Sequence, residues 1–192
     1  MSKEKPNLNL PNVLSAFRLI LVPVFVYLYF YGDRSGQLWA GGVFLLAAAT
    51  DILDGRIARK YDLVTPLGRI LDPMADKLMQ CAAWICLAIA HVIPLWIAIG
   101  YLIKELLMTV GGFLMLRRYS DVFPSNYFGK GVSFCVFALA AFLILFPDVF
   151  PEGAPWLAGI LLLFSLAALA VYVIRYMRTS APRDDTPDDG RS

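Results

Sequence analysis

Six long apolar segments, separated by short polar stretches, make up most of the chain. They cover residues 12–31, 37–59, 70–91, 93–116, 128–147 and 154–177. Each is close to the length of about twenty residues that an α-helix needs to cross a bilayer. We therefore predict an all-α integral membrane bundle of six transmembrane helices. This bundle would form one domain over residues 1–178, and the polar residues 179–192 would form a disordered tail.

Basic residues gather at alternate ends of the predicted helices. They precede the first helix, surround the second and fourth connections and follow the last helix: Lys3, Lys5, Arg56, Arg59, Lys60, Arg69, Arg117, Arg118, Lys130, Arg175 and Arg178. The opposite connections hold only Arg34, beside Asp33, Asp148 and Glu152. Because cytoplasmic loops of membrane proteins carry the excess of Lys and Arg, both termini are expected in the cytoplasm.

Composition agrees with a membrane protein. The chain has 192 residues, of which 59% are hydrophobic, and its mean hydropathy is +0.65. This length is filled by the six segments and leaves no room for a separate soluble domain. The net charge of +2 is small, and we expect no nucleic-acid partner.

Four aspartates interrupt the apolar pattern at helical spacing. Asp51 and Asp54 lie on one predicted helix, and Asp72 and Asp76 lie on the next. Residues three or four positions apart share a helix face, so each pair points in one direction. Carboxylates are costly inside a membrane and usually face a polar cavity where they act. Two such faces side by side predict a site for one or two divalent cations, which prefer oxygen ligands.

Small residues and an arginine stand among these acids. Gly55 and Ala58 present almost no side chain, so a ligand could approach the backbone there. The guanidinium of Arg59 has a planar fork of donors that suits phosphate. Together with bound cations, these residues indicate a site for a nucleoside diphosphate group. Asp76, the last acid of the series, is the natural candidate to take a proton from an attacking hydroxyl.

Three further charged residues lie inside predicted helices. Arg18 either extends to the lipid headgroups or takes part in the site. Lys104 and Glu105 fall near the middle of the fourth helix, where charges are costly. Adjacent helical residues point about 100° apart, so we do not expect these two to pair with each other. Lys104 is expected to line the polar cavity, whereas Glu105 either lines it or neutralises another buried cation.

Arg117, Arg118 and Lys130 lie at the cytoplasmic ends of the fourth and fifth helices. They either serve only as a topology signal or form a pocket for a phosphate group. Lys130, between two glycines, is the best candidate for such a pocket.

The acids, small residues and arginine fit one pattern, D-x2-D-G-x2-A-R-x8-G-x3-D-x3-D, between Asp51 and Asp76. This pattern resembles that of the CDP-alcohol phosphatidyltransferases, integral membrane enzymes of phospholipid synthesis. The resemblance implies a homodimer in a bacterial plasma membrane, with the active site facing the cytoplasm. It implies that two divalent cations, Mg²⁺ or Mn²⁺, are held by Asp51, Asp54, Asp72 and Asp76. It implies that Asp76 acts as the base and that the CDP group contacts Asp51, Asp54, Gly55, Ala58, Arg59 and Gly68.

Two segments bear on the acceptor alcohol. Residues 9–18 and 71–77 are similar to bacterial phosphatidylglycerophosphate synthases. That similarity implies transfer of a phosphatidyl group from CDP-diacylglycerol to sn-glycerol 3-phosphate, with release of CMP. An anionic acceptor needs cations, and the candidates are Lys104, Arg117, Arg118 and Lys130.

Other interpretations of the sequence stay open. Those synthases often carry Arg-Glu where this chain has Lys104-Glu105. A relative that uses phosphatidylglycerol, to make cardiolipin, or an inositol phosphate is therefore an alternative. A metal or small-solute transporter is a more remote one. Transporters tend to bind substrate near the bilayer midplane, whereas these acids lie toward one face.

Overall fold

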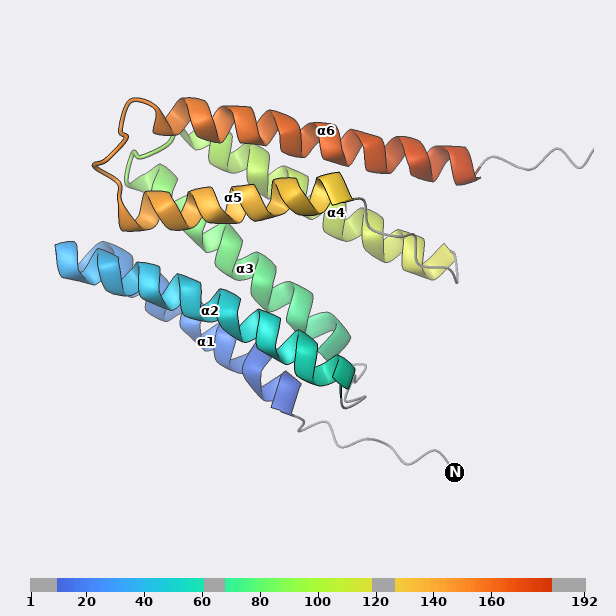
Figure 1. Cartoon of the computed structure of the whole chain (residues 1–192), viewed down its shortest axis with the longest axis horizontal. Coiled ribbons are helices and arrows are strands. Elements are labelled where there is room, and N and C mark those ends of the chain that lie inside the picture. Colours follow the sequence, from blue (N-terminus) through green and yellow to red (C-terminus); the bar gives the residue numbers. More distant parts are fainter. Residues whose placement is uncertain (1–9, 61–67, 119–126, 181–192) are drawn as a thin grey trace, which may run out of the picture.

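The computed structural model describes residues 10–60, 68–118 and 127–180. The regular elements in these ranges are all helices, joined by short connections (Figure 1). Their bounds are α1 Leu10–Tyr31, α2 Arg34–Lys60, α3 Gly68–Ile89, α4 Leu95–Arg118, α5 Tyr127–Leu145 and α6 Ala154–Ser180. Side chains are described for 13–53, 74–111, 129 and 131–174. The all-α prediction is confirmed for the described ranges. The expected tail lies almost entirely outside them, since α6 continues to Ser180.

Three of these helices are long and apolar enough to span a membrane. Among the described residues, Val13–Tyr31, Arg34–Leu53 and Ala154–Ile174 are long and apolar enough to cross a bilayer. Gly131–Leu145 of α5 is a shorter apolar helix. The described residues thus form six helices, of which three are candidate membrane spans. That all six cross the membrane stays a prediction.

Helix α3 lies at the centre of the bundle, where it packs against α1, α2, α4 and α5. Helices α1 and α2 lie together on one side of α3, and α5 and α6 on the other (Figure 1). The start of α1 and the ends of α2, α4 and α6 lie toward the same end of the bundle (Figure 1). At the opposite end, Arg34 of α2 forms an exposed ion pair of 3.1 Å with Asp148. The aspartates at the end of α2 and the start of α3 therefore belong to the end of the bundle where α1 begins.

Aromatic side chains make contacts between neighbouring helices. Phe44 of α2 lies between Phe25 of α1 and Phe137 of α5, with ring centroids 6.0 Å and 4.8 Å away. Trp84 of α3 stacks on Tyr101 of α4 at 4.1 Å. The hydroxyl of Tyr101 donates a hydrogen bond of 3.0 Å to the carbonyl of Ala158 in α6. These contacts connect α2 to α1 and α5, α3 to α4, and α4 to α6.

Candidate functional site

Asp51, the first aspartate of the pattern, is bonded to an arginine from another helix. Nη1 of Arg18 in α1 donates a hydrogen bond of 2.7 Å to Oδ1 of Asp51 in α2. The Arg18 side chain is 1% exposed, whereas that of Asp51 is 44% exposed. Of the two roles expected for Arg18, extension to the headgroups is therefore wrong. The reason is that an acidic partner on α2 neutralises the guanidinium inside the bundle.

Asp76 of α3 lies in the same region. Its side chain is half-buried. Its carboxylate interacts electrostatically with Lys77, Asp51, Arg18 and Glu105. Acids from α2 and α3 thus lie within electrostatic range of each other, as their spacing along the chain predicts.

The remaining members of the pattern are placed only by their backbone. Asp54, Gly55, Ala58 and Arg59 belong to α2, and Gly68 and Asp72 belong to α3. Both helices are continuous over these positions, and the sharing of a face by each aspartate pair stays a prediction from helical periodicity. The side chains of these six residues lie outside the description, and so do those of Arg117, Arg118 and Lys130. Their proposed contacts stay predictions.

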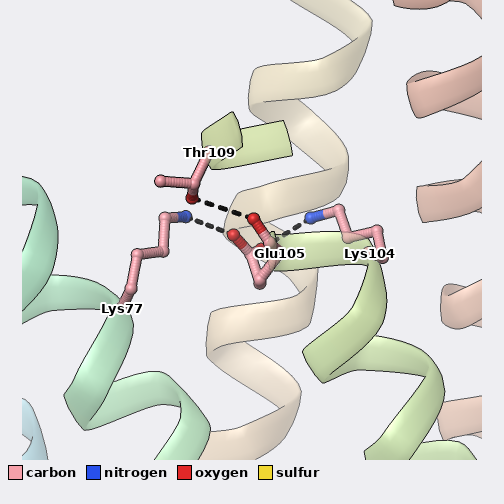
Figure 2. Close-up of polar contacts among 4 residues, drawn as sticks. All are labelled: Lys77, Lys104, Glu105 and Thr109. Carbon is pink, nitrogen blue, oxygen red and sulfur yellow. Dashed lines mark hydrogen bonds and ion pairs between the residues drawn. The ribbon is translucent and has the colours of Figure 1, made fainter. Parts of the chain in front are cut away.

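A second group of charges joins α3 to α4 (Figure 2). Oε2 of Glu105 lies 2.5 Å from Nζ of Lys77, and Oε1 lies 2.6 Å from Nζ of Lys104. The hydroxyl of Thr109 donates a bond of 2.8 Å to the backbone carbonyl of Glu105, within the same helix. The side chains of Lys104 and Glu105 are 3% and 12% exposed, and that of Lys77 is 35% exposed.

The expectation that Lys104 and Glu105 do not pair was wrong. Their Cβ atoms do diverge around the helix, but both side chains are long and flexible enough to bring their ends together. Glu105 does neutralise a buried cation, but that cation is Lys104 itself, and its second partner, Lys77, is partly exposed. Lys77 was not among the predicted site residues, and the only sequence signal for it was its position next to Asp76.

Carboxylates at this end of the bundle are the right donors for a hard divalent cation. Asp51 has one oxygen bonded to Arg18, and the side chain is exposed enough for a ligand to reach it. Among the side chains that the structure describes, no group of three or more His, Cys, Asp or Glu residues could hold a metal. Asp54 and Asp72 are not among those side chains. The described part therefore fits a cation site in donor chemistry, with Asp51 and Asp76 contributed by two helices.

The Arg18–Asp51 pair leads to a prediction for stability. Arg18→Met keeps an apolar stem of similar length but removes the donors, so Asp51 loses a charged hydrogen bond worth about 2 kcal/mol. We expect a lower midpoint of thermal unfolding in detergent. We also expect slower turnover, because Asp51 is no longer oriented. Arg18→Lys keeps the charge but loses the planar fork of donors. Its unfolding midpoint and turnover should lie between those of Arg18→Met and the unmodified protein. A midpoint and turnover equal to those of the unmodified protein would show that the pair has no such role.

Apolar helices of membrane-spanning length, with acids and cations between α1, α2, α3 and α4, are features of a membrane protein that carries charged groups inside its bundle. The chain belongs to the CDP-alcohol phosphatidyltransferase family, which matches residues 8–175. It is therefore an enzyme of that family, as the aspartate pattern predicted.

Relatives named for different acceptors are similar to this chain. A cardiolipin synthase (CMP-forming) of Streptomyces coelicolor is 34% identical, over 83% of this chain and 74% of its own length. A probable phosphatidylglycerophosphate synthase of Mycobacterium tuberculosis is also 34% identical, over 88% of this chain and 82% of its own. A CDP-diacylglycerol–glycerol-3-phosphate 3-phosphatidyltransferase of Bacillus subtilis is 35% identical, over 64% of this chain and 69% of its own. The reaction class is thus shared, while the acceptors differ.

Proposed function

We propose that this enzyme transfers the phosphatidyl group of CDP-diacylglycerol to sn-glycerol 3-phosphate, giving phosphatidylglycerophosphate and CMP. The main support for this reaction is that Asp51 of α2 and Asp76 of α3 lie within electrostatic range of each other at one end of the bundle. The acceptor is supported by residues 9–18 and 71–77 and by relatives named for this acceptor.

In the proposed reaction, the acceptor hydroxyl oxygen forms a bond to the phosphorus that carries the diacylglycerol group. The bond from that phosphorus to the oxygen of CMP breaks, and CMP leaves with the electron pair. Asp76 takes the hydroxyl proton. Gly55, Ala58 and Gly68 leave room for the CDP group, Arg59 binds its phosphates, and Arg18 holds Asp51 in place.

We further propose that Asp51, Asp54, Asp72 and Asp76 hold two divalent cations, Mg²⁺ or Mn²⁺. Such ions, when bound, neutralise charge on the diphosphate and on the leaving group. The support is the carboxylate chemistry of the four residues and the approach of the two that the structure describes. Asp51 and Asp54 would also contact the CDP group.

For the acceptor phosphate, we propose Arg117, Arg118 and Lys130, which lie at the end of α4 and the start of α5. Lys104 was a further candidate. Its side chain is buried and bonded to Glu105, so a phosphate would have to displace that carboxylate. The end of the bundle that carries these residues would face the cytoplasm, on the inner side of a bacterial plasma membrane, and so would both termini. The reason is that basic residues gather there. The family resemblance supports a homodimer.

A panel of acceptors tests the proposal. Purified enzyme in detergent, with CDP-diacylglycerol and Mg²⁺, would receive glycerol 3-phosphate, phosphatidylglycerol, inositol 1-phosphate or serine. We expect CMP release with glycerol 3-phosphate to exceed that with each other acceptor by about tenfold or more, since a site matched to one charged acceptor leaves groups unpaired with the others. Fastest release with phosphatidylglycerol would instead establish cardiolipin synthesis, which the Streptomyces relative favours. No release with any acceptor would contradict the proposed reaction.

A further inference from the structure

The Lys77–Glu105–Lys104 cluster, defined by these three residues, has no part in the proposed chemistry. One ion pair, of 2.5 Å between Lys77 and Glu105, joins the central helix α3 to α4, and a second, of 2.6 Å within α4, links the same carboxylate to Lys104 (Figure 2). Well-packed apolar residues would hold two helices together at least as well, because burying charges has a desolvation cost. A buried charge cluster in a membrane protein is therefore more informative about function than about stability.

The position of Lys77 connects this cluster to the site. Lys77 follows Asp76 directly in α3, and consecutive helical side chains point about 100° apart. Lys77 reaches toward Glu105 on α4, while Asp76 interacts with Asp51 and Arg18, which belong to α2 and α1. Holding Lys77 against α4 therefore fixes the rotation of α3 about its axis. That rotation determines where the Asp76 carboxylate points.

Charge balance ties the same groups together. Two lysines share one glutamate in the cluster, which leaves one positive charge in excess. Asp76 interacts electrostatically with both Lys77 and Glu105. The excess positive charge of the cluster therefore lies within electrostatic range of the Asp76 carboxylate.

We propose that Glu105 is a positioning residue: through its ion pair with Lys77 it sets the orientation of α3 that directs Asp76 toward the site formed with α1 and α2. This inference rests on the proposed role of Asp76 as base. Lys104 neutralises the remaining oxygen of Glu105 and keeps it in place. A positioning role requires that loss of the Lys77–Glu105 pair slows the transfer step while leaving substrate binding unchanged.

A double-mutant cycle tests this on the full-length enzyme in detergent. Glu105→Gln, Lys77→Met and the double variant would be compared in CMP release, with the acceptor that works best for the unmodified enzyme. We expect each single variant to lower kcat by about tenfold, with the KM for CDP-diacylglycerol within about twofold of normal. The double variant should be no slower than the singles, because all three lose the same contact.

Two further variants complete the experiment. Glu105→Asp keeps the charge, and the flexible lysine can follow the shorter side chain, so most of the activity should return. Asp148→Asn breaks the exposed ion pair with Arg34 at the other end of the bundle and should leave kcat unchanged. If Glu105→Gln does not fold, Glu105→Ala with Lys77→Ala removes both charges together and gives the same comparison of kcat with KM.

Several results would overturn the proposal. One is a lower midpoint of thermal unfolding with normal kcat per folded molecule, since this would make the cluster purely structural. Additive losses in the double variant would show that Lys77 and Glu105 act separately. A rise in the KM for CDP-diacylglycerol with normal kcat would place the cluster in substrate binding. The acceptor panel on the unmodified enzyme reports independently on the proposed function, so the two proposals can fail separately.

Discussion

Replacing Asp76 with Asn is expected to lower kcat by about 10²–10⁴-fold, the range over which a positioned acid or base contributes to catalysis. An amide cannot accept the proton of the attacking hydroxyl at neutral pH, although it has nearly the same shape as the carboxylate. Binding of CDP-diacylglycerol should persist, because Arg59 and the small residues of α2 are unchanged. The measurements are CMP release at saturating substrates and competition by CDP for the bound lipid substrate.

The Asp76→Asn result must be separated from loss of a cation ligand. Raising the Mg²⁺ concentration should not restore turnover if the missing function is proton removal. Glu152→Gln, at an exposed acid in the connection between α5 and α6, serves as a matched control and should behave normally. A variant at Asp76 that turns over near the normal rate would remove this residue from the role of base.

Asp54→Asn is expected to reduce turnover by more than about 100-fold, because it removes a proposed direct ligand of a divalent cation. Chelation by EDTA should abolish the activity of the unmodified enzyme, and added Mg²⁺ or Mn²⁺ should restore it. Binding of Mn²⁺ followed by electron paramagnetic resonance gives a readout that does not depend on catalysis. We expect weaker binding in Asp54→Asn and normal binding in Glu152→Gln. Normal turnover without any divalent ion would refute the cation role of the aspartates.

Much of the fold could be predicted because its determinants are local. The length and apolar character of each segment predict the helices, and the observed bounds differ from the predicted ones by a few residues. Helical periodicity alone also predicts that Asp51 shares a face with Asp54, and Asp72 with Asp76. That α2 and α3 bring Asp51 and Asp76 within electrostatic range is a tertiary fact that agrees with this prediction.

The contacts of the buried cations could not be predicted in the same way. Arg18 and Asp51 are 33 positions apart, and only the packing of α1 against α2 makes them partners. For Lys104 and Glu105, backbone direction alone gives the wrong answer, because two long side chains can bring their charged ends together. Lys77 received no prediction, because its partner lies on a helix whose position relative to α3 the sequence does not specify. In each case the missing information was which helices are neighbours.

The ion pair between Lys77 of α3 and Glu105 of α4 also bears on how the chain is made. In the proposed membrane arrangement, Lys77 leaves the ribosome while Glu105 is still inside the exit tunnel, so Lys77 reaches the bilayer without its partner. A lone charge in hydrocarbon is unfavourable, which would hold α3 near the insertion machinery until α4 arrives. Helices α3 and α4 would then leave the translocon as a pair, and the order of synthesis would protect the half-formed site from lipid.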